Sequence, residues 1–279
     1  MKTVRIRASS FWDWCDCALR AASRNPDIGG VVDTPVTTPG WLGTSVHRAA
    51  AVYDRASHIE ENPISVGDAV DSFLDTFRNP DEEVNWGEDK PKKVEPVGVR
   101  LVKSYAEIIS PQFEYEAVEA TLEQFSIEFT AEELSHPTEG VTLVITGTED
   151  RRTVDADGTA VLDIKTGVQA VGPDGVAKVA GFEGQLGLYT LMDEATTGEV
   201  NEGVPKIAGL QTSSAGRVGV GVVPNAKEVL IGNDQFNGQL FHLAKIIAHE
   251  IFMGNTRSMM CHEKYCPVYH KCPYRAREV

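Results

Sequence analysis

Hydrophobic and polar residues alternate along the middle of the chain with the two-residue period that is typical of β-strands. Three such runs follow one another: YEAVEATLEQFSIEF at 115–129, GVTLVITGTEDRR at 140–152 and GTAVLDIKTG at 158–167. Two further apolar runs, KIAGLQTSS at 206–214 and GRVGVGVV at 216–223, also have strand character. The sequence DADG between the second and third runs is rich in turn-forming residues and predicts a β-hairpin.

Helical periodicity occurs on both sides of these strands and once between them. The segments that we predict as helices are 9–24, 42–56, 97–110, 180–195 and 234–254. Residues 79–96 are charged and bounded by prolines, so we predict a loop there. This order of elements predicts an α/β fold with a mixed β-sheet and additional helical parts at both ends.

The composition is that of a globular protein, with 42% hydrophobic residues in a chain of 279. No run approaches the roughly 20 apolar residues that a membrane-spanning helix needs, so we expect no membrane association. The N-terminal stretch lacks the apolar segment of a signal peptide, so we expect a cytoplasmic protein. The net charge of −15 argues against a protein that coats nucleic acid, because such proteins are basic. An enzyme with a narrow basic groove is still compatible with it, since salt screens charges more than about 10 Å apart.

The predicted hairpin carries Asp150 on its first strand and Asp163 and Lys165 on its second. A loop of residues 156–157 would put Asp150 opposite Asp163, whereas a loop of residues 157–158 would put it opposite Lys165. In both registers the three side chains project from one face of the sheet. A three-residue loop would place Asp150 on the other face. Taken alone, the hairpin is most simply interpreted as a solvated surface.

Two carboxylates at directly opposite strand positions repel each other, and a divalent cation between them would remove that repulsion. Carboxylates and water are the ligands that Mg²⁺ and Mn²⁺ prefer. Such an ion lowers the pKa of a bound water molecule, and a nearby lysine can orient or deprotonate that water. The pattern therefore fits metal-dependent hydrolysis of a phosphodiester.

Together with its neighbours, the hairpin resembles the core of the PD-(D/E)xK nuclease superfamily, and within it the RecB-like iron–sulfur exonucleases of the CRISPR-associated and phage recombination type. The matching motifs are Gly43 and His47 (G-x-x-x-H), Gly147 and Asp150 (G-x-x-D), Asp163 and Lys165 with Thr166 and Gly167 (D-x-K and Thr-Gly), and Gln185 and Tyr189 (Q-x-x-x-Y). That family usually has one more acid on its first core strand. Glu119 is our choice for it, with Glu116 and Glu123 as alternatives. The resemblance covers most of the chain and implies a restriction-endonuclease-like core, in which helices flank a mixed central sheet.

The resemblance also implies a role for each of these residues. The ligands of Mg²⁺ or Mn²⁺ would be His47, Glu119, Asp150, Asp163 and, through its main-chain carbonyl, Ile164. Lys165 would position or activate the attacking water. Gln185 and Tyr189, four residues apart on one helical face, would orient Lys165 and contact DNA.

All five cysteines lie near the two ends of the chain: Cys15, Cys17, Cys261, Cys266 and Cys272. In a reducing compartment, clustered cysteines favour metal binding over disulfides. The tail CHEKYCPVYHKC resembles that of RecB-like nucleases that bind a [4Fe–4S] cluster, although four residues separate its first two cysteines where two are commoner. The resemblance implies Cys17, Cys261, Cys266 and Cys272 as ligands, with Cys15 as the alternative to Cys17. Zn²⁺ bound by three cysteines and His262 or His270, and free buried thiols, are the other interpretations.

From these motifs we divide the chain into three parts. Residues 1–113 form an N-terminal helical region with the first cluster cysteine and the His47 motif. Residues 114–255 form the nuclease core. Residues 256–279 form a cysteine-rich segment that packs against the N-terminus, and a metal cluster would join the two ends.

The function that the resemblance implies is metal-dependent exonuclease action on DNA, with single-stranded ends favoured, in recombination, repair or phage DNA processing. Recombination or replication proteins in a bacterial or phage-infected cell are candidate partners, and self-association is an option. Candidate DNA contacts are Arg20, Arg48, Tyr189, Lys264 and Tyr265. The alternatives are a non-catalytic DNA-binding or scaffold subunit that retains the fold, and a zinc-stabilised protein–protein module. The presence of Asp150, Asp163 and Lys165 argues against a subunit that has lost its catalytic residues.

Overall fold

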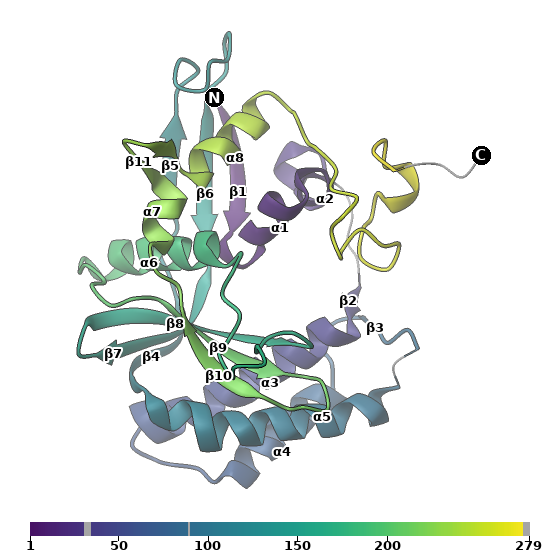
Figure 1. Cartoon of the computed structure of the whole chain (residues 1–279), viewed down its shortest axis with the longest axis vertical. Helices are drawn as coiled ribbons and strands as arrows, with labels where there is room; N and C mark the ends of the chain where they lie inside the picture. The colour runs from purple at the N-terminus through teal and green to yellow at the C-terminus, as the bar shows by residue number, and fades with distance from the viewer. Residues whose placement is uncertain (31–34, 89, 276–279) are drawn as a thin grey trace.

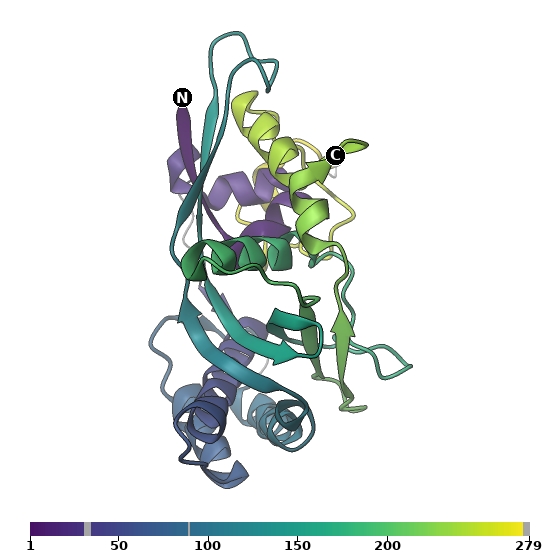
Figure 2. The same cartoon turned by 90° about the vertical axis from the view of Figure 1, so that its left-hand side faces the viewer.

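The computed structural model describes residues 1–30, 35–88 and 90–275, and in them two β-sheets lie on either side of helix α6 (Glu183–Thr197; Figures 1 and 2). The larger sheet has the strand order β10-β9-β8-β7-β4, and the smaller has the order β1-β6-β5. The strands of the larger sheet are β4 (Glu114–Thr121), β7 (Thr148–Asp155), β8 (Gly158–Gly167), β9 (Lys206–Gln211) and β10 (Val218–Val222). Those of the smaller sheet are β1 (Lys2–Arg7), β5 (Phe125–Phe129) and β6 (Val141–Thr146).

Both sheets are mixed. In the larger sheet β8 runs parallel to β9, whereas β7 is antiparallel to both β8 and β4. In the smaller sheet β1 runs parallel to β6, and β5 is antiparallel to it. The prediction of an α/β fold with a mixed central sheet flanked by helices is confirmed.

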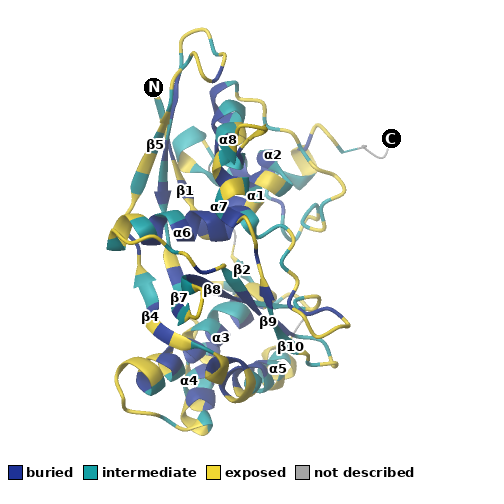
Figure 3. Cartoon of the chain, turned by 60° about the vertical axis from the view of Figure 1, so that its left-hand side comes forward, coloured by how far each residue is buried: buried dark blue, intermediate teal, exposed yellow. Residues whose placement is uncertain are grey.

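The two faces of the larger sheet are buried in two separate hydrophobic clusters. Leu162 and Ile164 of β8 pack with helices on one face, and Val161 belongs to the cluster on the other, as the two-residue period of a strand requires. The helices on the first face are α3 (Thr38–Asp54), α4 (Val66–Arg78) and α5 (Pro91–Ser104). On the second face α6 is largely buried, as its dark blue colour shows (Figure 3).

The smaller sheet packs with α6 and with four short helices: α1 (Phe11–Asp16), α2 (Ala18–Arg24), α7 (Ala226–Ile231) and α8 (Gln239–Ala248). Two short strand pairs complete the described chain: β2 (Val36–Thr37) with β3 (Val84–Asn85), and β11 (Gly232–Asn233) with β12 (Phe236–Asn237). The C-terminal segment lies beside α2, where Leu19 N donates to the carbonyl of Met253 (Figure 1). Within the described ranges, no helix combines the length and the apolar character needed to cross a membrane.

Several predicted elements were wrong in extent. The β-runs 115–129 and 140–152 each divide into two strands of different sheets, β4 and β5 in the first run and β6 and β7 in the second. The helix predicted over 9–24 is interrupted at Cys17, whose backbone is extended (φ −152°, ψ 92°). Residues 91–96, predicted as loop, belong to α5, because Pro91 lies in its first turn, where no main-chain donor is needed. The helix predicted over 234–254 is only α8, which begins after Gly238 at the end of the β11–β12 turn.

Helix α7 and the short strands β2, β3, β11 and β12 were not predicted from the sequence, and neither were two longer elements. Helix α4 begins at a capping box in which Ser65 and Asp68 bond each other's main-chain N–H groups. Strand β1 occupies residues that we had assigned to a helical region, and it adds an edge strand to the smaller sheet.

Candidate active site

One cavity of about 380 Å³ lies where α3 and α6 approach strands β4, β7 and β8. Its lining includes all seven side chains singled out by the sequence motifs: His47, Glu119, Asp150, Asp163, Lys165, Gln185 and Tyr189. The lining also includes four polar residues that no motif had indicated: Arg7, Ser9, Thr44 and Thr148. The fold therefore gathers the candidate residues into a single site.

The β7–β8 hairpin has the register with a loop of residues 156–157. Asp155 pairs with Gly158 and Arg151 pairs with Leu162, so that one step further Asp150 lies opposite Asp163. Beyond the Arg151–Leu162 pair, the Asp150 side chain joins the two strands, because its Oδ2 accepts the N–H of Ile164 at 2.8 Å. One of the two sequence-based registers is thereby selected, and it brings the two carboxylates together.

His47 reaches Asp150 from helix α3. This helix starts at the N-cap residue Thr37, and close packing at Gly43 sets its position, since a Cβ on Gly43 would lie 3.0 Å from Thr166 Oγ1 of β8. Nδ1 of His47 is 3.2 Å from Asp150 Oδ2. Burial alone would lower the pKa of His47, but the carboxylates of Asp150 and Asp163 outweigh burial and raise it.

The two aspartates have opposite pKa shifts. Burial would raise the pKa of Asp150, but the charges of His47, Lys165 and Arg151 outweigh it and lower that pKa. For Asp163, burial and the Asp150 charge prevail over the attraction of Lys165, and its pKa is raised. The site thus holds one firmly ionised carboxylate beside a second that is harder to ionise.

Asp163 is surrounded by Lys165 and by two residues of α6. Lys165 Nζ is 2.7 Å from Asp163 Oδ2, and Gln185 Nε2 donates to Asp163 Oδ1 at 3.1 Å. Gln185 Nε2 also lies 3.4 Å from the hydroxyl of Tyr189. Tyr189 itself can approach because Gly147 is opposite, where a Cβ would lie 3.1 Å from its ring. Burial and the Asp163 charge raise the pKa of Tyr189, so its hydroxyl keeps its proton at neutral pH.

Glu119 completes the acidic wall of the cavity from strand β4. Its backbone has a φ of +53°, which is uncommon for a residue other than glycine. The alternatives Glu116 and Glu123 do not line the cavity, and Glu116 instead bonds Arg152 at 3.1 Å. A register shift between Tyr115 and residue 117 changes which side chains face the site, and sequence alternation alone does not reveal such a shift.

A buried polar network behind the site was not predicted. Arg151 is fully buried and contacts three groups: Asp54 (Nε to Oδ2, 2.6 Å), the carbonyl of Asp150 (2.6 Å) and Glu119 (3.4 Å). Asp54 in turn accepts hydrogen bonds of 2.6 Å from the hydroxyls of Tyr105 and Ser110. The network ties β7 and the Glu119 region to helix α3 and the segment after α5.

The donor set fits a hard divalent cation. It consists of the carboxylates of Asp150, Asp163 and Glu119 with the imidazole of His47, and such oxygen-rich sets suit Mg²⁺ or Mn²⁺. Among the described residues, the buried Asp163 Oδ2 is paired with the ammonium of Lys165 at 2.7 Å, so a metal bound to this oxygen would take the place of that contact. Across residues 1–30, 35–88 and 90–275, however, no three His, Cys, Asp or Glu side chains are arranged to hold a metal as they stand. His47 and Lys165 contact the carboxylate oxygens that an ion would need.

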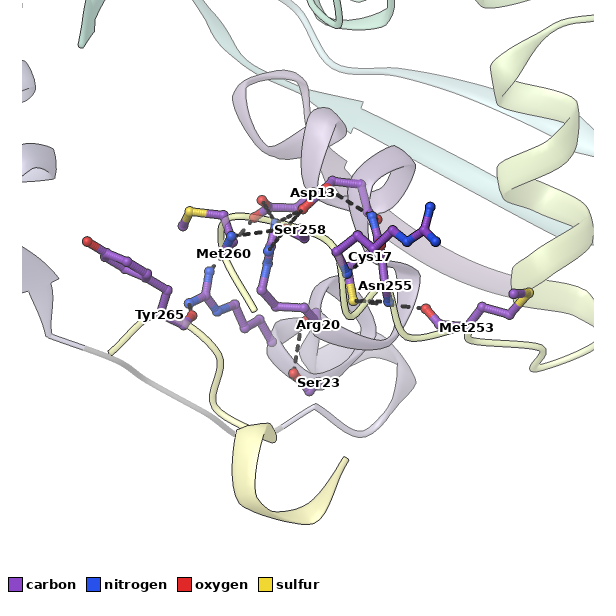
Figure 4. Close-up of polar contacts among 12 residues, drawn as sticks. Asp13, Cys17, Arg20, Ser23, Met253, Asn255, Ser258, Met260 and Tyr265 are labelled. Carbon is purple, nitrogen blue, oxygen red and sulfur yellow. Dashed lines mark hydrogen bonds and ion pairs between the residues drawn. The ribbon is translucent and has the colours of Figure 1, made fainter. Parts of the chain in front are cut away.

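The four cysteines singled out as cluster ligands line one small cavity of about 10 Å³, which Arg20 and Tyr269 also line. The lining cysteines are Cys17, Cys261, Cys266 and Cys272, whereas Cys15 does not take part. Cys17 lies at the break between α1 and α2, where its Sγ is 3.4 Å from Asn255 N (Figure 4). Burial raises the pKa of the Cys266 thiol, and the nearby Cys17 and Cys261 add to this effect.

The candidate histidine ligands of a zinc site lie elsewhere. His262 lines a different cavity with Lys264, and the side chain of His270 is 76% exposed, 3.6 Å from Glu263. Arg20, a candidate DNA contact, points toward Asp13 (Figure 4). It is buried and also pairs with Asp16, so that prediction was wrong. Arg48 does line the active-site cavity.

Comparison with known proteins identifies the family of the chain. A family model of the PD-(D/E)XK nuclease superfamily matches residues 8–277, and none of the curated proteins matches the chain. Among solved structures, that of a "putative exonuclease" from Eubacterium rectale has a TM-score of 0.44 and 10% sequence identity, covering 99% of this chain and 90% of that one. On the evidence of the family model, which spans nearly the whole chain, this protein belongs to the PD-(D/E)XK nuclease superfamily.

Proposed function

We propose that the protein is a Mg²⁺- or Mn²⁺-dependent DNA exonuclease that hydrolyses phosphodiester bonds and favours single-stranded ends. The observation that carries this proposal is the convergence of Asp150, Asp163 and Lys165 with His47 and Glu119 on one cavity, in a chain of a nuclease superfamily. Enzymes of this superfamily generally use Mg²⁺ or Mn²⁺. A subunit that had lost catalysis would be expected to have lost one of the acids or the lysine, and this chain retains them all.

Each residue has a part in the proposed reaction. Asp150, Asp163, Glu119, His47 and the Ile164 carbonyl would hold the cation, which supplies the positive charge that stabilises the developing charge on phosphorus oxygens.

Three further side chains of the site would position the reacting groups. Lys165, 2.7 Å from Asp163, can donate a hydrogen bond to the attacking water or to a phosphate oxygen above the hairpin. Gln185 holds Asp163 in place through its 3.1 Å hydrogen bond. Tyr189, which keeps its proton, can donate to a phosphate oxygen.

The proposal is tested with end-labelled single- and double-stranded DNA in Mg²⁺, Mn²⁺ or EDTA. We expect metal-dependent release of labelled nucleotides, with single strands degraded faster, and loss of that activity in Lys165→Ala. Lys178→Ala, on the exposed loop after β8, is the matched lysine control. Equal cleavage by wild type and Lys165→Ala, or none by the wild type, would contradict the proposal.

We further propose that Cys17, Cys261, Cys266 and Cys272 hold a [4Fe–4S] cluster. Four thiols around one cavity support this ligand set, and the positions of His262 and His270 disfavour a site of three cysteines and one histidine. A cluster needs more room than about 10 Å³, so residues 261–272 would shift outward on binding. These residues have little regular secondary structure, apart from a short 3₁₀ turn at Tyr269–Lys271. The competing ion is Zn²⁺, and iron, zinc and sulfide analysis of an anaerobic preparation distinguishes the two.

We also propose a biological setting for this activity. DNA recombination, repair or phage DNA processing produces single-stranded ends, and an enzyme acting on them would work in the cytoplasm of a bacterial or phage-infected cell. In that setting its partners would be recombination or replication proteins, or further copies of itself. We retain the division into 1–113, 114–255 and 256–279 as a proposal about which parts supply the first cluster ligand, the nuclease core and the remaining ligands.

A further inference from the structure

Two cavities meet at the side chain of Arg7, the last residue of strand β1. The first is the active-site cavity of about 380 Å³, and the second, of about 480 Å³, lies against β1, α1 and α2. Arg7 lines both, whereas Ser9 lines only the first and Ser10 only the second. Arg7 therefore stands at the boundary between the metal-binding acids and a neighbouring hollow large enough for part of a nucleotide.

The guanidinium of Arg7 differs from those of the neighbouring arginines in having no hydrogen-bond or ion-pair partner among the described residues. Arg5, two residues earlier on the same face of β1, is held by Asp27 through Nε at 3.0 Å and Nη2 at 2.7 Å. Arg24, across the second cavity, donates to the carbonyl of Tyr265 at 2.6 Å. Arg7 is exposed, and its side chain has no ion pair or hydrogen bond with any residue in the described part of the chain. Its charge is therefore available to a ligand.

The carboxylates that line the second cavity repel an anionic ligand only weakly, because arginines already pair with them. Asp27 is bound by Arg5, and Asp13 is bound by Arg20 at 2.8 Å. The position of Arg7 is also fixed by the main chain, since Arg7 pairs with Thr146 of β6 and its carbonyl accepts the hydroxyl of Ser10 at 3.0 Å. An unpaired arginine side chain on a fixed main chain beside the active-site cavity suits a backbone phosphate, whose two free oxygens match the fork of the guanidinium.

We propose that Arg7 binds the backbone phosphate adjacent to the scissile one, on the side where the strand passes from the active-site cavity into the cavity lined by Arg5 and Arg24. This inference rests on the proposed function. Because the contact is to the backbone, it adds affinity without sequence preference. It assigns to β1 a part in substrate binding that none of the sequence motifs indicated.

The first test is binding of a fluorescent single-stranded oligonucleotide, followed by anisotropy with Ca²⁺ in place of Mg²⁺ over a series of salt concentrations. We expect Arg7→Gln to raise Kd about 3- to 10-fold and to reduce the salt dependence by about 0.7, the value for one lost phosphate contact on a single strand. Arg78→Gln is the control, since it also removes an arginine, one that pairs with the carboxylate of Glu95, and neither residue lines either cavity. It should leave both quantities unchanged.

The second test locates the phosphate with oligonucleotides that carry one neutral methylphosphonate linkage at successive positions. For the wild type, neutralising the linkage that Arg7 contacts should weaken binding by the same factor as Arg7→Gln does. For Arg7→Gln, neutralising the same linkage should not weaken binding any further. Two results would overturn the inference. One is that Arg7→Gln binds the oligonucleotide as tightly as the wild type does. The other is that each methylphosphonate linkage weakens binding equally in both proteins.

The two proposals fail in distinguishable ways. If the wild type cleaves DNA with metal but Arg7→Gln binds and cleaves like it, only the role of Arg7 is wrong. If the wild type neither binds nor cleaves DNA, the proposed function is wrong, and the inference about Arg7 is wrong with it.

Discussion

Arg151 and Asp54 form a fully buried ion pair directly behind the acids proposed to bind metal, with Nε of Arg151 2.6 Å from Oδ2 of Asp54. The same guanidinium holds the carbonyl of Asp150 and contacts Glu119, while Nη2 is buried without a hydrogen-bond partner among the described residues. The pair therefore links the strand that carries Asp150 to helix α3, which carries His47. Both stability and active-site geometry should depend on it.

Replacing Arg151 by Met should destabilise the fold by about 3–5 kcal/mol, because it leaves the Asp54 carboxylate buried and unpaired. The free energy of unfolding from urea titration measures this. Replacing both residues, in Asp54→Asn with Arg151→Met, should restore part of the loss, since no buried charge remains. The matched control is Arg78→Met, which breaks an exposed pair with Glu95 and should cause no measurable change. Equal stability of Arg151→Met and Arg78→Met would show that the buried pair does not stabilise the fold.

Glu119 should prove to be the third acid of the site. Glu119→Ala should lower activity and Mg²⁺ affinity by about 10- to 100-fold, as expected for loss of a group that supports a metal. Glu116→Ala and Glu123→Ala are matched controls on or next to the same strand and should leave both unchanged, because neither side chain lines the cavity. Calorimetric titration with Mn²⁺ measures affinity independently of turnover. A loss in either control equal to that in Glu119→Ala would mean that the wrong acid was chosen.

The backbone conformation of Glu119 leads to a second prediction, which concerns the stability of variants at this position. At a φ of +53° an ordinary residue is strained, and glycine is not. Glu119→Gly should therefore be more stable than Glu119→Ala by about 1 kcal/mol, while both are equally inactive. The difference in urea midpoint between the two variants measures it, and equal midpoints would mean that this position stores no strain.

The hairpin and its acids could be predicted from the sequence because they depend on local patterns. With a two-residue loop, alternation places Asp150, Asp163 and Lys165 on one face in either of two registers, and the fold uses one of them. The sequence did not exclude the three-residue loop that would have placed Asp150 on the other face. Helix spacing likewise placed Gln185 and Tyr189 on one face of α6. Local periodicity was sufficient to predict the relative positions of residues that lie in one helix or in one hairpin.

The parts that escaped prediction depend on contacts between distant segments. Arg151 follows Asp150 directly and would be taken for a strand residue that points away from the site, yet its long side chain returns to Glu119 and Asp54. Strand β1 pairs with β6, about 140 positions later. The alternation of Val4 and Ile6 with arginines is a local strand signal, but no local pattern indicates that Arg7 lies in the site. The break at Cys17 is likewise set by its neighbours Met253 and Asn255 at the other end of the chain.

The two N-terminal cysteines should differ in their effect on the proposed cluster. Cys17 lines the cavity with the three C-terminal cysteines, whereas Cys15 is exposed outside it. Cys17→Ser should therefore lose most of its iron and its visible absorption, and should melt at a lower temperature because the two ends are no longer joined. Cys15→Ser should retain all three properties. The reverse outcome would identify Cys15 as the ligand, and the absence of iron and of zinc from the wild type would mean that the thiols are free.

Glu149 should make the fold less stable as pH rises. This residue of β7 is buried, and both of its carboxylate oxygens lack hydrogen-bond partners among the described residues. Burial and the nearby Asp193, with a smaller contribution from Asp150, raise its pKa from 4.5 to about 8 despite the neighbouring Arg152. Below pH 4.5 the folded and unfolded chains both carry this proton. Between pH 4.5 and 8 the unfolded chain releases it and the folded chain keeps it, so stability falls throughout this interval.

Glu149→Gln should remove this dependence, because the amide is neutral in both states. In EDTA, the wild type should lose on the order of a few kcal/mol of unfolding free energy relative to Glu149→Gln between pH 5 and pH 8. Glu128→Gln, an exposed position on β5, is the control and should follow the wild type. Taking the difference between variants cancels the titration of His47 and the two aspartates, which all three proteins share. If the wild-type and Glu149→Gln curves run parallel, folding does not raise the pKa of Glu149, and the prediction is wrong.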